Sequence, residues 1–152
     1  MRINKNPLRK QLKQVRKLAS LELRRTFPLQ SYPHLRKIRS RPHAKIAIYL
    51  ATRDEAPCEG VIRWAKQRQL QLFVPVIPPR GRTLGFVHLP TYPAKTHPHL
   101  WMRNRYGIWE PRHTPQQCYT ANQLDLLVMP LVGYADAGVR LGMGGGYYDY
   151  SL

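Results

Sequence analysis

The segment that most constrains this fold lies near the C-terminus, where an apolar run leads into a turn dense in glycine. Residues 124–132 are apolar apart from Asp125 and Pro130, and residues 140–149 read RLGMGGGYYD. An apolar run without polar alternation predicts a strand covered on both faces. Glycines expose backbone N–H groups to an anion because no Cβ atom stands in the way. The pattern favours a phosphate site after a buried strand, with a plain tight turn as the alternative.

Charged side chains at both ends of this turn suit a bound nucleotide. Arg140 supplies a fixed positive charge, and Asp149 supplies a carboxylate that can hold Mg²⁺. The run lacks the lysine of a Walker motif, and it comes too late in the chain for a dinucleotide fingerprint. The glycines therefore indicate a phosphate-binding loop of neither common type.

The remaining pattern predicts an α/β fold with a largely parallel sheet, because strand-like and helix-like runs alternate. Apolar residues spaced by three and four predict a first helix over about residues 7–26, ended by Phe27-Pro28 and followed by irregular or weakly helical chain over residues 29–43. The other expected elements are strands at 46–50, 70–77, 84–89 and 124–132, helices at 57–69 and 114–122, and a Pro- and His-rich loop at 90–105. No composition shift divides the chain, so residues 1–152 are expected to form a single domain.

The charge is strongly positive and unevenly distributed. The net charge is +17, and residues 1–45 hold more than half of the 25 Lys and Arg with one acid, Glu22. Such a stretch suits RNA, an anionic ligand or a solvated helix face. Only Phe27 and Tyr32 are aromatic there, too few to interleave as a base-stacking surface. A nucleic-acid partner is therefore not expected, although a basic RNA-associated protein stays an alternative.

Other features narrow the setting of the protein. Apolar runs of about nine residues are too short for a membrane span, and the polar N-terminus does not suit a signal peptide. Cys58 and Cys118 form no CxxC pair and are expected to be free thiols. His97 and His99 have no Cys or acidic partner at metal-ligand spacing, so a loop is expected there. We expect a cytoplasmic monomer.

Three segments can meet at the carboxyl ends of the strands, where open α/β sheets bind ligands. One is the glycine turn, and another is residues 52–55, which follow the expected strand at 46–50 and include Glu55. The third holds Lys5 and Arg9, whose spacing of four puts both on one helix face. Together they can clamp a polyphosphate. Separately, Lys5 and Arg9 suit a solvated helix face and Glu55 suits a surface acid.

The order of these segments resembles the 5-formyltetrahydrofolate cyclo-ligase family, also called methenyltetrahydrofolate synthetase. The resemblance covers nearly the whole chain, and its most specific part is the last apolar run with RLGMGGGYYD. The other matching motifs are Lys5-x-x-Leu8-Arg9, Tyr49-Leu50 followed by Asp54-Glu55, residues 107–111 (GIWEP) and residues 124–134. The implied fold is a three-layer α/β/α sandwich of the sugar-phosphate isomerase and CoA-transferase type, with a mostly parallel sheet.

The resemblance implies an ATP- and Mg²⁺-dependent closure of 5-formyltetrahydrofolate to 5,10-methenyltetrahydrofolate, with release of ADP and phosphate. It assigns catalysis to Lys5 and Arg140 and a Mg²⁺ contact to Asp149. The implied ATP contacts are Lys5, Arg9, Arg140, Leu141, Gly142, Met143, Gly144, Gly145, Gly146, Tyr147 and Tyr148. The implied folate contacts are Leu50, Glu55, Met143, Gly144, Gly145, Gly146 and Tyr147. Tyr106 and Trp109 are possible stacking partners of the pterin or ordinary aromatics, and Glu110 is expected to orient its loop.

This chain departs from the family pattern at its end. Family members continue past the Tyr-Tyr-Asp motif with a helix, a strand and a second acidic Mg²⁺ contact, whereas this sequence stops at Leu152. We therefore expect a C-terminally truncated domain, a strand edge without its neighbour and no helix after Asp149. Tyr150 also stands where bacterial members commonly have Arg. An inactive member that binds folate or nucleotide without turnover is the alternative function.

Overall fold

The computed structural model describes residues 4–92 and 97–152. Its helices are α1 (Asn6–Leu35), α2 (Glu59–Gln67) and α3 (Tyr147–Ser151), with 3₁₀ turns η2 (Pro98–Leu100), η3 (Pro115–Gln117) and η4 (Ala121–Gln123). Its strands are β1 (Lys45–Ala47), β2 (Gln71–Val76), β3 (Gly85–His88), β4 (Trp101–Arg103), β5 (Trp109–Pro111), β6 (Leu126–Leu127), β7 (Gly133–Tyr134) and β8 (Arg140–Leu141). The expected alternation of strands and helices is confirmed.

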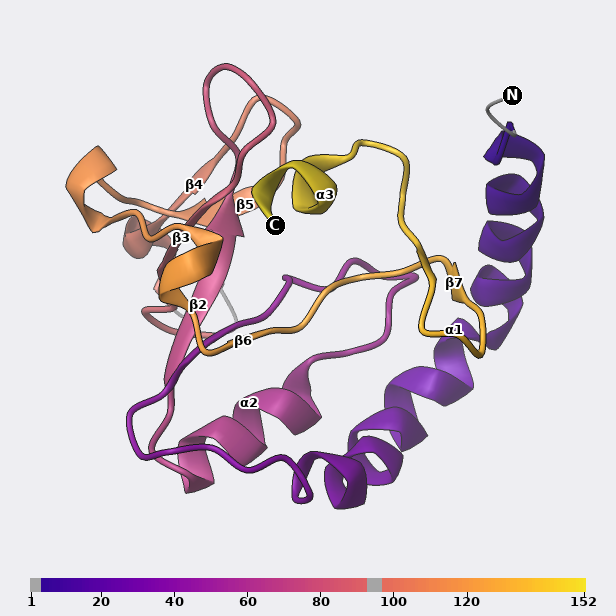
Figure 1. Cartoon of the computed structure of the whole chain (residues 1–152), viewed down its shortest axis with the longest axis horizontal. Helices are drawn as coiled ribbons and strands as arrows, with labels where there is room; N and C mark the ends of the chain where they lie inside the picture. The colour runs from indigo at the N-terminus through magenta and orange to yellow at the C-terminus, as the bar shows by residue number, and fades with distance from the viewer. Residues whose placement is uncertain (1–3, 93–96) are drawn as a thin grey trace.

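The central sheet has the order β3-β2-β1-β6, and it is mostly parallel as expected. Strand β1 pairs parallel with β2 on one side and with β6 on the other, and only β3 runs antiparallel to its neighbour. Backbone bonds from Ile48 to Phe73 and from Val128 to Ala47 extend the pairing past the short strands. Figure 1 shows these strands in the middle of the molecule. The carboxyl ends of β1 and β6 therefore lie next to each other.

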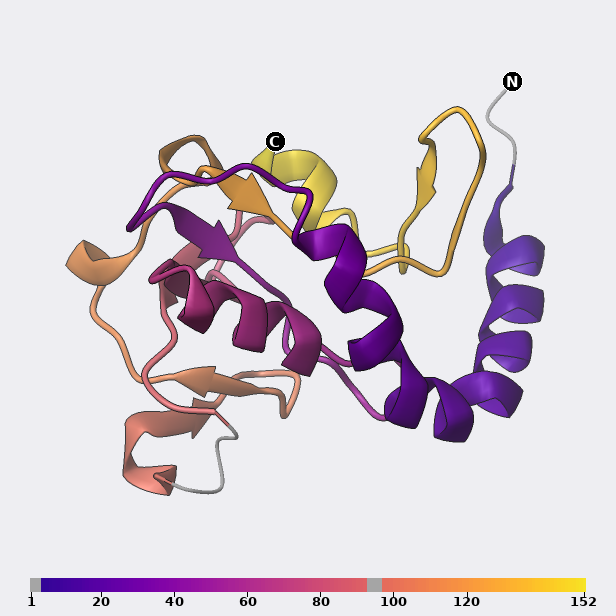
Figure 2. The ribbon, with the colours of Figure 1, turned by 90° about the horizontal axis from the view of Figure 1, so that it is seen from below.

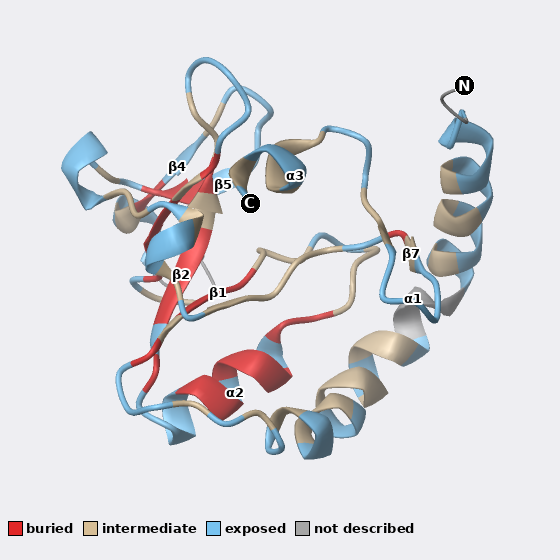
Figure 3. Cartoon of the chain, in the orientation of Figure 1, coloured by how far each residue is buried: buried red, intermediate tan, exposed pale blue. Residues whose placement is uncertain are grey.

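The two faces of the sheet are covered differently. Helix α2 lies over one face and contributes Val61, Ile62, Trp64 and Ala65 to the main core, and the C-terminal half of α1 packs beside α2 (Figure 2). The other face holds Phe73 and Phe86 under the η3–η4 segment and the tyrosines of α3. Figure 3 shows the buried residues concentrated in β1, β2 and α2. The α/β class is confirmed, whereas the full three-layer sandwich stays a prediction.

Helix α1 is longer than the sequence suggested, and the expected end at Phe27-Pro28 is wrong. It runs to Leu35 with Pro28 and Pro33 inside it. A Cβ atom on Gly60 of α2 would lie 3.0 Å from Pro28 O and 2.9 Å from Ser31 Oγ, so the glycine lets the two helices pack closely. This packing stabilises helix that proline would otherwise end. Figure 2 shows α1 bent near its middle.

Several other boundaries differ from expectation. The strands expected at 46–50 and 124–132 shorten to β1 and β6, because ladder bonding stops where the chains diverge toward the site. The loop expected at 90–105 contains η2 and β4, which pairs with β5 in a hairpin; residues 93–96 fall outside the described residues. The helix expected at 114–122 is replaced by η3 and η4. Thr114 starts η3, where Gln117 Oε1 accepts a bond from Thr114 N.

The C-terminal tyrosines form a helix that the sequence did not lead us to expect. Helix α3 makes one turn, closed by bonds from Tyr150 N to Gly146 O and from Leu152 N to Tyr148 O. Ser151 Oγ also accepts a bond from Leu84 N at 2.8 Å, next to β3. Tertiary contacts thus offset the nucleation cost that disfavours a short isolated helix. The helix carries the last residues of the glycine segment back onto the sheet.

Candidate active site

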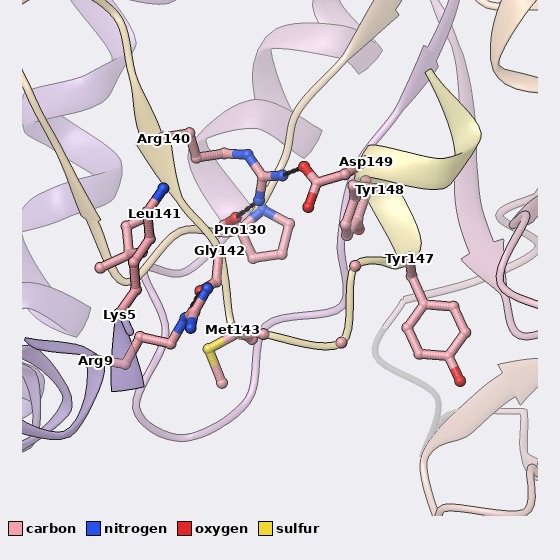
Figure 4. A pocket seen from close by; sticks show the side chains of 13 residues that line it. Lys5, Arg9, Pro130, Arg140, Leu141, Gly142, Met143, Tyr147, Tyr148 and Asp149 are labelled. Carbon is pink, nitrogen blue, oxygen red and sulfur yellow. Dashed lines mark hydrogen bonds and ion pairs between the residues drawn. The ribbon is translucent and has the colours of Figure 1, made fainter. Parts of the chain in front are cut away.

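The two ends of the chain meet at one cavity of about 390 Å³. Lys5 and Arg9 of the N-terminal segment line it together with Pro130 and residues 140–149. Arg9 Nε donates a hydrogen bond to Gly142 O at 2.9 Å, and Figure 4 shows both basic side chains directed toward the glycine segment. The expected meeting of Lys5 and Arg9 with this segment is therefore confirmed.

The backbone of the glycine segment takes conformations that other residues avoid. Gly144 has φ +105° and Gly146 has φ +72°, both in the left-handed region. A Cβ atom on Gly144 would also lie 3.7 Å from the guanidinium carbon of Arg9. The segment thus needs glycine for its path, and a backbone with such conformations can form a cradle for an anion.

Arg140 is fixed at the back of this cavity. Its Nη2 donates to Asp149 Oδ1 at 2.6 Å, and its Nη1 donates to Pro130 O at 3.1 Å. The Arg140 side chain is 17% exposed and the Asp149 side chain is 70% exposed. The cation is thus held in place by its partners, while the carboxylate still faces solvent.

The site fits a divalent cation only in company with phosphate. Within residues 4–92 and 97–152, no three His, Cys, Asp or Glu side chains are grouped to hold a metal ion. Asp149 gives one carboxylate whose Oδ1 is bonded to Arg140. Mg²⁺ commonly binds through one or two carboxylates and the phosphates of a substrate, and this single acid matches that pattern.

A second, apolar cavity of about 560 Å³ adjoins the first. Its walls come from the strand ends and the β4–β5 hairpin. They include Tyr49, Leu50, Thr52, Glu55, Pro75, Ile77, Leu84, Tyr106, Ile108, Trp109 and Glu110. A cavity of this size with few polar groups is typical of a site for a drug-sized organic ligand. Both candidate folate contacts from the β1–α2 connection, Leu50 and Glu55, lie in it.

The two cavities share one wall. Pro130, Met143, Gly145, Tyr147 and Tyr148 line both of them. A ligand in the apolar cavity and an anion in the glycine cradle would therefore contact the same short segment. This is the arrangement that a transfer between two bound substrates requires.

Tyrosines and carboxylates in the apolar cavity are held in defined states. Burial raises the pKa of Tyr148 well above its usual range, so its hydroxyl stays neutral. Hydrogen bonds from Tyr106 and Arg105 lower the pKa of Tyr147. Glu55 Oε2 accepts a bond from Thr52 N at 2.8 Å, which fixes its carboxylate near the cavity wall.

Glu110 organises the hairpin as expected. It is buried, and its Oε1 accepts bonds from Ile77 N at 2.8 Å and from Asn104 Nδ2 at 2.7 Å. These bonds join the end of β2 to the tip of the β4–β5 hairpin, which carries Tyr106 and Trp109 to the apolar cavity. Burying an acid is costly unless it is bonded in this way.

Comparison with known proteins now identifies the group to which the chain belongs. The model of the 5-formyltetrahydrofolate cyclo-ligase family matches residues 2–152. The chain belongs to this family. A 5-formyltetrahydrofolate cyclo-ligase of Haemophilus influenzae is 34% identical over 120 residues, which cover 78% of this chain and 60% of that protein. The Escherichia coli K12 cyclo-ligase is 31% identical over 109 residues, 70% of this chain and 56% of that protein. This chain thus spans less than two thirds of the length of either relative.

Solved structures of this kind share the fold. A 5,10-methenyltetrahydrofolate synthetase from Aquifex aeolicus aligns with 99% of this chain and 72% of its own, with a TM-score of 0.72 and 23% identity. One from Mycoplasma pneumoniae aligns with 99% of this chain and 77% of its own, with a TM-score of 0.61 and 22% identity. At these identities the likeness shows the fold alone.

Against this cyclo-ligase background, most of the expected site residues gather as the sequence suggested. All eleven expected ATP contacts line the cavity at the chain ends, together with Asp149. Of the expected folate contacts, Leu50, Glu55, Met143, Gly145 and Tyr147 line the apolar cavity, whereas Gly144 and Gly146 line only the first. Which ligand each residue binds stays a prediction.

Sequence reasoning missed several residues that line the candidate site. Pro130 lines both cavities, and Tyr49, Ile77 and Leu84 line the apolar one. Their position at strand ends was the available signal, because ligands bind there in open sheets.

Other residues weighed as possible site members lie elsewhere. Asp125 accepts bonds from Arg41 and from Lys45 N, and the bond from Lys45 N is the main cause that lowers its pKa. This acid is structural, in line with its expected place at the start of a strand. Cys58 and Cys118 are both free. None of the described helices is long and apolar enough to cross a membrane.

Proposed function

We propose that this protein uses ATP to close 5-formyltetrahydrofolate to 5,10-methenyltetrahydrofolate, releasing ADP and phosphate. The observation that carries this proposal is the wall shared by the glycine cradle and the apolar cavity. A triphosphate in the cradle and a reduced folate in the apolar cavity would meet across Met143 and Gly145. Family membership supports the same reaction.

The chemistry needs an activated formyl oxygen. A formamide oxygen is a poor leaving group, so the γ-phosphoryl group moves to it and its bond to ADP breaks. The lone pair of N10 then attacks the formyl carbon, the carbon–oxygen bond breaks and phosphate departs with that oxygen. The N10 proton is lost to solvent. The work of the protein is positioning and charge stabilisation.

Four basic or backbone groups suit the triphosphate. Lys5 and Arg9 would reach it from the N-terminal segment, and Arg140 would face it from β8. The N–H groups of residues 142–146 would point at phosphate oxygens. Asp149 would hold Mg²⁺ that arrives with the nucleotide, and that ion supplies neutralisation of phosphate charge.

The apolar cavity suits the pterin and its formyl group. The Glu55 carboxylate, whose Oε2 accepts a bond from Thr52 N, can accept further bonds from the amino and ring N–H groups of a pterin. Trp109 and Tyr106 offer flat apolar faces on the hairpin. Tyr148 lines both cavities, and its neutral hydroxyl, whose pKa burial raises further, adds no negative charge beside the phosphates.

One assay tests the proposal. The 152-residue chain is mixed with 5-formyltetrahydrofolate, with and without ATP and Mg²⁺, and the absorbance of the methenyl product is followed. Growth that requires both additions supports the ligase. Saturable binding of ATP and the formylfolate without growth supports the binding protein instead. Binding of neither, with RNA binding that weakens steeply with salt, favours the RNA-associated alternative.

We further propose a single domain that works as a cytoplasmic monomer. Residues from both ends of one chain line the same cavity, so a single copy brings the proposed phosphate contacts together. Two free cysteines suit a reducing compartment.

A further inference from the structure

We propose that three arginines, Arg80, Arg82 and Arg105, form a subsite for the carboxylates of the folate's glutamate tail. They are called the arginine rim below. The inference rests on the proposed function, because it names where one end of that substrate lies. It assigns a task to charges that the phosphate cradle does not use.

The rim lies beside two residues that line the apolar cavity. Tyr106 of the β4–β5 hairpin and Tyr147 of α3 both line this cavity, and their hydroxyl oxygens are hydrogen-bonded at 2.8 Å. Arg105 directly precedes Tyr106, and Arg80 and Arg82 lie on the β2–β3 turn. In Figure 1 this turn and the tip of the hairpin lie above α3, whereas the β1–α2 connection, which includes Glu55, lies below it.

Arg105 is held rigidly by neutral partners. Its Nη1 donates to Pro79 O at 2.6 Å, and its Nη2 donates to Tyr147 Oη at 3.4 Å. Its guanidinium also lies 5.0 Å from the centre of the Tyr106 ring. An arginine already fixed in this way loses less side-chain entropy when it binds a carboxylate.

Arg82 is placed by an aromatic ring. Its guanidinium lies 5.3 Å from the centre of the Tyr150 ring on α3. A Cβ atom on Gly146 would lie 3.8 Å from its Nη1, so the β2–β3 turn reaches the end of the glycine segment. Arg80 is exposed on the same turn. Arg82 and Arg105 thus contact α3 from two loops, and Arg80 adds a third positive charge on one of them.

No carboxylate of the described chain balances these charges. The ion pairs within residues 4–92 and 97–152 are Arg41 with Asp125 and Arg140 with Asp149. The two acids that line the apolar cavity, Glu55 and Glu110, already accept backbone hydrogen bonds. A cluster of arginine forks without acidic partners matches a ligand that brings its own carboxylates.

The substrate supplies such groups at the end remote from its pterin. Taking carboxylates into the apolar cavity would strip their water without pairing them, which is strongly unfavourable. With the pterin near Glu55, the glutamate therefore emerges where Tyr106 and Tyr147 meet, beside Arg105. Longer tails of linked glutamates would continue onto Arg80 and Arg82.

The test compares ligands with and without the tail. Binding of 5-formyltetrahydrofolate and of the amide of 5-formyltetrahydropteroate, which carries neither glutamate nor any other carboxylate, is measured by the fluorescence of Trp109 in the cavity wall. The wild-type chain is expected to bind the tailed compound about tenfold more tightly, with a ratio that shrinks as salt rises. Arg105→Ala is expected to weaken the tailed compound about tenfold and to leave the tailless compound unchanged.

Arg63→Ala is the matched control, since Arg63 is an exposed arginine of α2 outside both cavities. It should change neither affinity. Equal wild-type affinities for the two compounds at low salt would overturn the subsite even if Arg105→Ala does not fold. Equal weakening of both compounds by Arg105→Ala would overturn it too, since Arg105 would then act only through Tyr147. Absence of saturable binding of either compound would overturn the proposed function itself.

Discussion

The guanidinium of Arg9 donates a 2.9 Å hydrogen bond to the carbonyl of Gly142, across 133 positions of the sequence. This bond ties the first turn of α1 to the residue after β8. It places a cation beside the segment that is proposed to bind the phosphates. The phosphate cradle therefore depends on both ends of the chain being docked.

Replacing Arg9 tests that dependence. Arg9→Ala is expected to raise the KM for ATP about tenfold or more, because both a phosphate partner and the tie to Gly142 are lost. Loss of this partly buried bond should also lower the free energy of unfolding by about 1 kcal/mol. Steady-state kinetics and urea unfolding measure the two effects. Lys10→Ala, an exposed neighbour on the same helix, should change neither; an ATP KM unchanged in Arg9→Ala would contradict the assigned role.

The glycine segment offers a test with a built-in control. Gly144→Ala places a Cβ atom at φ +105° beside Arg9 and should reduce turnover more than tenfold, because the cradle must distort. Gly138→Ala meets a similar strain at φ +75° in open space, in the turn before β8. Each should lose about 1 kcal/mol of stability, but only Gly144→Ala should lose activity. Equal turnover in the two variants would contradict a role of the glycine segment in the reaction.

Arg140 is expected to matter for turnover more than for binding. Its ion pair and its bond to Pro130 hold the charge beside the transferring phosphoryl group, so Arg140→Ala should lower kcat at least tenfold. Arg140→Lys should recover part of that loss, because it keeps the charge without the fork. Single-turnover rates at saturating ATP give the comparison. Turnover equal to wild type in Arg140→Ala would contradict its catalytic assignment.

Replacing Glu55 tests the apolar cavity separately from the phosphate cradle, because Glu55 lines only the apolar cavity. Glu55→Gln is expected to raise the KM for 5-formyltetrahydrofolate about tenfold while the KM for ATP stays within twofold, because only the pterin contacts change. Glu59→Gln, an exposed acid at the start of α2, is the control. Initial rates over a grid of both substrates reveal the effect. An equal rise in the KM for ATP would contradict the assignment of Glu55 to the pterin.

Buried hydroxyl and thiol groups set the alkaline limit of stability. Burial raises the pKa of Cys58 to about 12 and moves the pKa values of Tyr49 and Tyr148 upward as well. Neutral forms are favoured in the fold, so their contribution is intact below the pKa of the unfolded chain and is lost as pH rises above it. The midpoint of thermal unfolding should therefore fall between about pH 8.5 and pH 12. Cys58→Ala should make the midpoint fall less steeply with pH. An unchanged dependence on pH would show that Cys58 does not contribute to it.

Local patterns were enough for the alternation of strands and helices, the buried strand before the glycines, and the pairing of Lys5 with Arg9. Each of these depends on residues within a few positions of one another, such as a spacing of four on a helix or a run of apolar side chains. The resemblance to the cyclo-ligases added the expected ligands to these elements.

Other features depended on contacts between distant segments. Helix α1 continues through Pro28 because Gly60 lets α2 pack closely against it. Helix α3 forms because its Ser151 accepts a bond from Leu84 N and its tyrosines pack against the core around Phe73 and Phe86. These tertiary contacts cannot be found from the local sequence, and helix propensity alone is too weak to predict a helix end that packing decides. The wall shared by the two cavities likewise comes from segments that are distant in the sequence. The arginines beside the apolar cavity also come from two separate loops. The sequence alone thus determined the alternation of strands and helices and the chemistry of the glycine segment, and only the tertiary structure decided the bounds of several elements and which side chains surround that segment.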